Sequence, residues 1–299
     1  MNRKNSAALE SGRTLRSLAL TLTALLVVSG AALAQDTTYS FTTIIYPGDT
    51  FTQTLSINKS GTIAGYHGAT INKGFTLVLP SKFTSENFPT SAQTQVIGID
   101  SNGDTDGFYI NRAGTTHGFM KVGATYTTVD YPGTTFNQLL GLNDKNQAAG
   151  YYADAAGNDH AYIYDAKGGV FLLMYIPGST SAQATGVNNT GEVCGFYIDN
   201  QGVNHGFLLN AGTFTKLDYP DATFTQALGL NNENQVVGTY VDAGNLTHGF
   251  VWSNGTFQSV DDPDGVGTTL INGTNDLGQI VGFYVDSTGN TDGFLGTPE

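Results

Sequence analysis

The chain has 299 residues, with 12 basic and 25 acidic side chains and a formal net charge of −13 at pH 7. A surface of this sign repels phosphate backbones and anionic lipid headgroups, so we expect neither a nucleic-acid partner nor a membrane-surface role. A single cysteine, Cys194, rules out an intramolecular disulfide, and a buried thiol is the simplest interpretation of it.

The first 34 residues have the pattern of an export signal. Arg13 and Arg16 precede an apolar stretch over about residues 18–28, and Ala32-Leu33-Ala34 supplies the small residues that a signal peptidase recognises. The stretch is shorter than the roughly 20 residues that span a bilayer. We expect a signal peptide over 1–34 and a secreted protein, extracellular or periplasmic. The mature chain, 35–299, then carries 8 basic and 24 acidic side chains, for a net charge of −16.

A unit of 42 to 45 residues repeats six times along the mature chain. Three landmarks recur in step: a turn residue, a Gly-aromatic pair and a proline. The turn residues are Asn58, Asp100, Asn143, Asn188, Asn231 and Asn275, and the prolines are Pro47, Pro89, Pro132, Pro177, Pro220 and Pro263. The aromatic residues of the pairs are Phe75, Phe119, Tyr162, Phe207, Phe250 and Phe294. A repeat of this length with strand-like patterning is typical of a β-propeller blade.

Residues 212–254 show the pattern of one unit most clearly. They predict strands over 212–219, 224–230, 235–241 and 248–252, separated by turn-forming residues. Asn254-Gly255 follows the fourth strand and is a strong hairpin signal, because both residues tolerate positive φ. The sequence therefore predicts an all-β fold, a six-bladed β-propeller of four-stranded antiparallel blades over 35–299.

Loop lengths predict how the ring closes. The longest Pro-Gly-rich link, typified by 132–136, suits the crossing from the outer edge of one blade to the channel side of the next. The strand before each proline is then outermost. The first such strand, 39–46, has no unit of its own, and the last three strands, over about 268–295, lack an outer partner. We expect the N-terminal strand to complete the last blade and the protein to be a monomer.

Two of the units are similar to the HAF-type repeats of bacterial extracellular proteins. They run from Val193-Cys-Gly-Phe-Tyr-Ile-Asp199 to His205-Gly-Phe207, and from Ile280-Val-Gly-Phe-Tyr-Val-Asp286 to Asp292-Gly-Phe294. Most copies have Gly in place of the family's Ala, which only His160-Ala-Tyr162 keeps. The resemblance implies export and a propeller-like repeat, and it brings no established catalytic residues.

A tyrosine followed two residues later by an aspartate recurs in four units, and a spacing of two puts both side chains on one side of a strand. One interpretation is structural: the aspartate accepts hydrogen bonds in a turn and the tyrosine packs between blades. The other is a ligand-binding set that comprises Tyr152, Asp154, Tyr197, Asp199, Tyr240, Asp242, Tyr284 and Asp286. A ring of carboxylates on the face with the crossing loops could also bind Ca²⁺, the one cofactor we consider, through Asp154, Asp159, Asp199, Asp242, Asp286 and Asp292.

Catalytic signatures are missing from the sequence. It has no Gly-x-Ser-x-Gly elbow, no phosphate-binding loop and no spaced Cys/His set, and four histidines recur one per unit rather than in a cluster: His117, His160, His205 and His248. Acids outside the repeat pattern mostly fall in predicted turns: Glu86, Glu192, Glu233, Asp221 and Asp264. We therefore assign no catalytic residue.

The sequence favours a non-catalytic secreted protein that binds a polysaccharide or protein ligand or has a structural role. The alternative is a carbohydrate-active hydrolase or lyase that uses carboxylates at a mouth of the propeller channel. Acids from different blades within about 5 to 10 Å of each other would favour that enzyme. A channel lined by small and apolar side chains would count against it.

Overall fold

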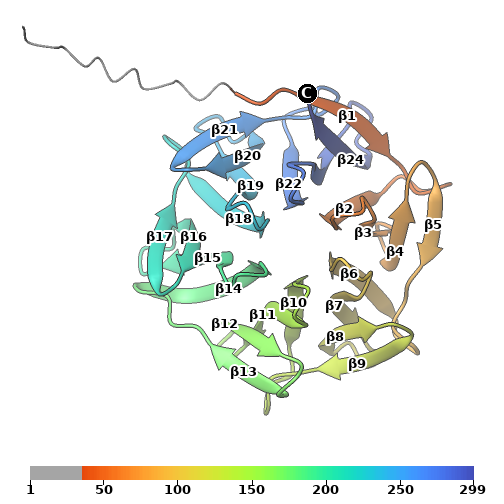
Figure 1. Cartoon of the computed structure of the whole chain (residues 1–299), viewed down its shortest axis with the longest axis vertical. Helices are drawn as coiled ribbons and strands as arrows, with labels where there is room; N and C mark the ends of the chain where they lie inside the picture. The colour runs from red at the N-terminus through yellow and green to blue at the C-terminus, as the bar shows by residue number, and fades with distance from the viewer. Residues whose placement is uncertain (1–35) are drawn as a thin grey trace, which may run out of the picture. The chain divides into compact units, whose positions relative to one another are not determined.

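Six four-stranded antiparallel sheets surround a central channel, as Figure 1 shows. This is a computed structural model that describes residues 36–299. The predicted signal peptide, 1–34, lies outside the described residues. Within 36–299, no helix has the length and hydropathy needed to cross a membrane.

Each blade is one sheet; in blades 1 to 5 the strands follow the chain order from the channel outward, and blade 6 takes its outermost strand from the N-terminal end of the described chain. Blade 1 comprises β2 (Thr52–Ile57), β3 (Ile63–His67), β4 (Lys73–Val78) and β5 (Lys82–Ser85); blade 2 comprises β6 (Gln93–Ile99), β7 (Thr105–Ile110), β8 (Thr116–Val122) and β9 (Thr125–Val129). Blade 3 comprises β10 (Asn137–Leu142), β11 (Gln147–Ala153), β12 (Asp159–Asp165) and β13 (Val170–Leu173); blade 4 comprises β14 (Ser179–Val187), β15 (Val193–Asp199), β16 (Asn204–Asn210) and β17 (Thr213–Leu217). Blade 5 comprises β18 (Phe224–Leu230), β19 (Val236–Val241), β20 (Thr247–Ser253) and β21 (Thr256–Val260); blade 6 comprises β22 (Thr269–Thr274), β23 (Ile280–Val285), β24 (Thr291–Pro298) and β1 (Tyr39–Ile44).

The predicted ring closure is confirmed. β1 is the outermost strand of blade 6 and pairs antiparallel with β24, so that Thr42 lies opposite Leu295. The strand ends at Ile44 rather than at Tyr46, because the Tyr46 carbonyl accepts a hydrogen bond from the amide of Asp49 and begins the turn of the crossing loop.

The blades pack face to face through the aromatic residues of the repeated Gly-aromatic pairs. All six are less than 2% exposed: Phe75, Phe119, Tyr162, Phe207, Phe250 and Phe294. Tyr162 of blade 3, for example, packs against Met120 and Val129 of blade 2. Burying a side chain of this size stabilises the fold by about 1.5–3 kcal/mol, so the repeat is held by one aromatic anchor per blade.

The inner strands approach each other closely at one end of the channel, where glycine is required. At Gly141 an added Cβ would lie 2.7 Å from the carbonyl oxygen of Thr185 on the inner strand of the next blade. Any other residue would force these strands apart. The convergence narrows the channel toward the turns that follow the inner strands.

The interface between blades 2 and 3 contains a buried acid. Asp106 on β7 has no exposed surface; its Oδ1 accepts the amide of Gly98 at 2.8 Å, whereas its Oδ2 has no hydrogen-bond partner among residues 36–299. Burial raises the pKa of Asp106 to about 8. The equivalent residues in the other blades are apolar or a thiol: Ala64, Ala149, Cys194, Val237 and Val281.

Candidate functional site: the central channel

The six inner strands line the channel in three layers. Residues five positions before each turn residue form a wide opening on the face with the crossing loops, which we call the vestibule. Residues three positions before the turn form a waist, and the turns themselves form a polar mouth at the opposite face. Alternation along a strand explains this order, since every second side chain faces the channel.

Glutamines dominate the vestibule, a cavity of about 330 Å³. Five of the six inner strands contribute one each: Gln53, Gln95, Gln138, Gln183 and Gln226. Leu270 occupies the same position on β22 of blade 6. The vestibule therefore presents an almost complete ring of uncharged amides.

Aromatic side chains stand beside these amides. Gln95 lies directly opposite Phe108 on the neighbouring strand, and Gln138 lies opposite Tyr151. Gln53 pairs with Tyr66 and Gln183 with Phe196 in the same way. Opposed residues share one face of an antiparallel sheet, so four of the five amides stand beside an aromatic group, whereas Gln226 lies opposite Thr239.

One end of each amide is held by a protein group. The Tyr66 and Tyr151 hydroxyls donate to the Oε1 atoms of Gln53 and Gln138, at 2.5 and 2.9 Å. The Nε2 atoms of the other three donate to residues of the preceding blade: Gln95 to Asn72, Gln183 to Asp159 and Gln226 to Asn204. Within residues 36–299 the opposite end of each amide makes no hydrogen bond, which leaves two Nε2 donors and three Oε1 acceptors for a ligand.

The waist is mostly aliphatic. Leu55, Ile97, Leu140 and Leu228 surround it, with Thr185 and Asn272 in the remaining two blades. The Thr185 hydroxyl donates to the Ala227 carbonyl at 2.9 Å, which satisfies it within the protein. The waist forms an apolar floor under the vestibule.

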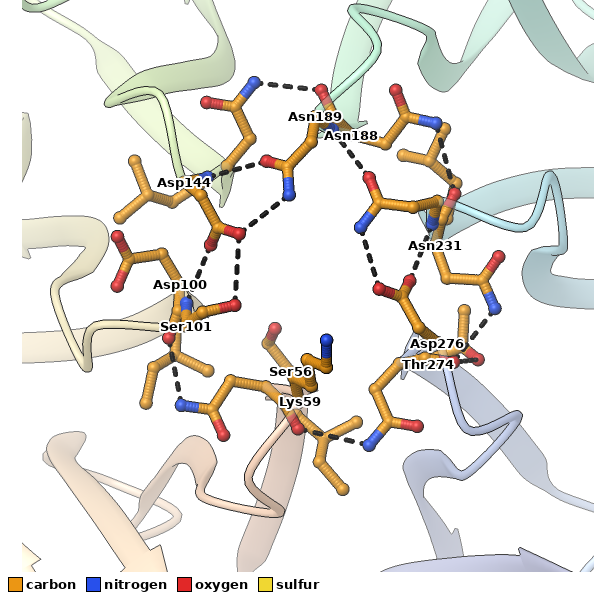
Figure 2. A pocket seen from close by; sticks show the side chains of 18 of the residues that line it. Ser56, Lys59, Asp100, Ser101, Asp144, Asn188, Asn189, Asn231, Thr274 and Asp276 are labelled. Atoms are coloured by element: carbon orange, nitrogen blue, oxygen red, sulfur yellow. Dashed lines mark hydrogen bonds between the residues drawn. The ribbon is translucent and has the colours of Figure 1, made fainter.

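The polar mouth consists of two rings of turn residues, which Figure 2 shows around a small cavity of about 90 Å³. In one ring, asparagine side chains donate to the carbonyl of the equivalent residue in the next blade, for example Asn143 to Asn188 at 2.9 Å. In the next ring, Asp144 accepts the amide of Ser101 at 2.8 Å, and Asp276 accepts that of Asn232 at 2.8 Å. Lys59 points into the opening. These bonds tie the blades together at the narrow end.

The carboxylates of the polar mouth are engaged in this network. Burial opposes ionisation of Asp144, but hydrogen bonds from Ser101 and Asn189 outweigh it and lower its pKa. Burial raises the pKa of Asp100, whose oxygens accept bonds from its own turn. Asp144 and Asp276 hold neighbouring blades in register through their hydrogen bonds, whereas Asp100 stabilises its own turn.

The tyrosines of the predicted Tyr/Asp set do not line the vestibule, and two of them stack on tyrosines of the crossing loops that enter their blades. Tyr240 stacks on Tyr219 at 3.6 Å between ring centroids, and its hydroxyl bonds Ser259. Tyr284 is 3% exposed and bonds Thr43 of β1. Tyr152 stacks on Tyr131, and Tyr197 is 6% exposed. The ligand-binding role of this set stays a prediction.

The aspartates of the same set cap the turns between the second and third strands of each blade. Asp199 Oδ1 accepts the amides of Gln201 and Val203, and Asp154, Asp242 and Asp286 bond their turns in the same way. Hydrogen bonds from His160 and from backbone amides lower the pKa of Asp154. Asp159 contacts Gln183 at the vestibule, and Asp292 is 6% exposed. In residues 36–299 no three His, Cys, Asp or Glu side chains are grouped to hold a metal ion; calcium binding by the predicted residues stays a prediction.

Two of the repeated histidines, His205 and His248, link a turn aspartate to the outer part of their blade. His205 lies 3.3 Å from Asp199 through Nε2 and 2.8 Å from Asp218 through Nδ1. His248 bridges Asp242 and Asp261 in the same way. Each histidine belongs to a separate blade, so its contacts stabilise that blade alone.

Sequence reasoning missed the glutamines, although they carry a signal. A glutamine stands five residues before the turn residue in five of the six units. If the strand before each proline is outermost, the next strand along the chain must be the one that lines the channel. The glutamine position then faces the channel as well.

Glu86 and Glu192 were also predicted in turns, but they are 3% and 6% exposed. Lys121 pairs with Glu86 at 2.7 Å, and Asn188 donates to Glu192 at 2.5 Å.

Comparisons with solved structures support the fold. The chain is similar to AofleA from Arthrobotrys oligospora, with a TM-score of 0.56, 11% identity and coverage of 88% of each chain. It is also similar to TolB from Acinetobacter baumannii, with a TM-score of 0.55 and 11% identity over 85% of this chain and 65% of that one. A six-bladed fungal lectin with a fucose recognition mode, Aleuria aurantia lectin, gives a TM-score of 0.51 and 9% identity over 87% of this chain and 91% of the lectin.

Sequence comparisons identify no relative. No family model matches the chain, and no curated protein does. The resemblance to HAF-type repeats therefore stays a prediction, and at these low identities the structural matches define a class of architecture, the six-bladed β-propeller.

Proposed function

We propose that this protein is an exported, non-catalytic binding module whose vestibule holds an uncharged saccharide. The observation that carries the proposal is the ring of five glutamines, four of them opposite aromatic side chains, above an apolar floor. Amides offer both donors and acceptors to hydroxyl groups, and aromatic faces pack against the C–H faces of a sugar ring. Export rests on the signal pattern in residues 1–34.

Three further features support an uncharged ligand. A cavity of about 330 Å³ falls within the range of ~300–1,000 Å³ for small-molecule sites. No charged residue lines it, and the net charge of −16 over 35–299 disfavours anionic sugars. One neighbour of the same architecture, Aleuria aurantia lectin, recognises fucose.

Isothermal titration calorimetry with cellohexaose, mannohexaose and chitohexaose tests the proposal. The matched variant is Gln95→Leu, because Leu270 is the natural residue at this position in blade 6. We expect at least one of the three sugars to bind, Gln95→Leu to weaken that binding at least tenfold, and the anionic oligogalacturonate not to bind. Binding that is indifferent to Gln95→Leu would exclude the vestibule, and failure of all three sugars would favour a protein ligand.

A further inference from the structure

A second cavity, of about 450 Å³, lies between blades 4 and 5, away from the channel. Its walls come from β16, β17 and their connecting turn on one side and from β20 and the turns of blade 5 on the other. The lining residues are Leu208, Asn210, Ala211, Thr213, Thr215, Asn234, Trp252 and Asn254. We call it the blade 4–5 cleft.

Trp252 distinguishes this cleft from the other blade interfaces. It is the only tryptophan of the chain, it is half-buried, and it packs over the cluster that contains Leu208 and Leu217. The equivalent residues of the other blades are Leu77, Lys121, Tyr164, Leu209 and Gly296. An indole that is only partly covered by its own core offers a flat apolar surface to a ligand.

Part of the polar lining is fixed from behind by a buried acid. Glu192 is 6% exposed and accepts hydrogen bonds from the side-chain amides of Asn210 and Asn188. The side-chain amide of Asn234, oriented with its NH₂ group toward the acid, also donates to Glu192. The Nδ2 atoms of Asn210 and Asn234 are thereby committed to Glu192, which leaves their Oδ1 atoms as acceptors in the cleft.

The lining contains no charged side chain. The cleft is lined by the side chains of Asn210, Asn234, Asn254, Thr213 and Thr215 together with one aromatic ring. The carboxylate behind the amides and the acidic surface of the protein oppose anions. A neutral ring with hydroxyls on its edge and C–H groups on its face fits this combination.

We propose that the blade 4–5 cleft is a second binding site, for one residue of an uncharged saccharide stacked on Trp252. Asn210 and Asn234 then accept hydrogen bonds from ligand hydroxyls. This site shares no residue with the vestibule, so it stands even if the vestibule does not bind sugar. If both sites bind, the protein is bivalent toward a polysaccharide.

The single tryptophan makes the test specific, since its emission reports only this cleft. We expect cellohexaose, mannohexaose or chitohexaose to cause a saturable blue shift of Trp252 emission and to reduce its quenching by acrylamide. Gln95→Leu in the vestibule should leave this response unchanged. The absence of a saturable change with all three sugars at millimolar concentration would overturn the proposal.

Two variants check the geometry. Trp252→Leu, which installs the residue found at this position in blades 1 and 4, should abolish the cleft's binding in calorimetry while the protein remains folded by circular dichroism. Thr213→Ala removes an exposed hydroxyl without touching Glu192 and should weaken binding severalfold. A dissociation constant unchanged by both variants would place the sugar elsewhere.

Discussion

The side chain of Asn275 donates a hydrogen bond to the main-chain carbonyl of Asn58 at 3.1 Å, across 217 positions of sequence. It joins the last blade to the first at the polar mouth. Four other asparagines make the same bond to the next blade: Asn58, Asn143, Asn188 and Asn231. Asp100 interrupts the series, because a carboxylate has no donor for the Asn143 carbonyl.

The interruption at Asp100 yields a stability prediction. Asp100→Asn should supply the missing donor. It should also remove the cost of burying a carboxylate at this position, where burial raises the pKa of Asp100. We expect the free energy of unfolding to rise by about 0.5–1.5 kcal/mol, measured by urea unfolding at pH 7. The reverse change, Asn275→Asp, should lower it by about 1–3 kcal/mol. If both variants and the parent had the same free energy of unfolding, the hydrogen bonds between blades at the polar mouth would contribute nothing to stability.

A second prediction concerns Asp106. Its folded-state pKa of about 8 lies above the ordinary value of 3.8, so the folded state binds the proton more tightly than the unfolded state does. This group therefore makes the free energy of unfolding fall as pH rises from about 4 to about 8, by about 1.36 kcal/mol for each pKa unit at most. Asp106→Asn, which stays neutral, should flatten that part of the pH profile and raise the melting temperature at pH 8. An unchanged slope between pH 5 and pH 8 would contradict the assignment.

His248 should contribute a pH dependence of its own. Burial opposes its charge, but hydrogen bonds to Asp261 and Asp242 outweigh burial and raise its pKa above 6.5. Its contribution to stability is fully present below pH 6.5 and is lost as pH rises through the folded-state pKa. His248→Gln should therefore lower the melting temperature more at pH 5.5 than at pH 8.5. The matched control is His160→Gln, because His160 contacts one carboxylate, Asp154, rather than two.

The N-terminal strand gives a fourth prediction. Deleting residues 35–47 removes the ladder of six residue pairs between β1 and β24, together with the buried Ile44. Each lost backbone hydrogen bond contributes a net ~0.5–1.5 kcal/mol, and the apolar face adds to it. We expect a marked loss of melting temperature relative to a chain that begins at residue 35. A melting temperature equal to that of the longer chain would refute the closure as a source of stability.

The repeat made most of the fold predictable. Period, strand order, the outermost position of the strand before each proline and closure by the N-terminal strand, predicted over 39–46, all followed from local patterns and loop lengths. The bond from Asn275 to Asn58 did not, since its acceptor belongs to another blade and only the ring brings it near. The sequence identified these asparagines as turn residues, but it did not show that their side chains also join neighbouring blades.

The site was harder to predict because its residues are ordinary within the repeat. Gln95 and Trp252 become candidate ligand contacts only through their surroundings in the fold. Phe108 lies opposite Gln95 across a strand pair, and Glu192 lies behind the cleft that Trp252 lines. Asp106 was missed for the opposite reason: it occupies a position where other blades have Ala, Cys or Val. A comparison of each position across the six units would have marked it as an exception.

Because β1 and β24 complete one blade, the two ends of the chain depend on each other during synthesis. Residues 39–44 are made first and must wait unpaired until 291–298 have left the ribosome. The ring therefore cannot close until residues 291–298 are available to pair, and until then blade 6 lacks its outermost contact. If the predicted signal in residues 1–34 directs export, we expect the unclosed chain to pass through a translocation pore more readily than the closed ring.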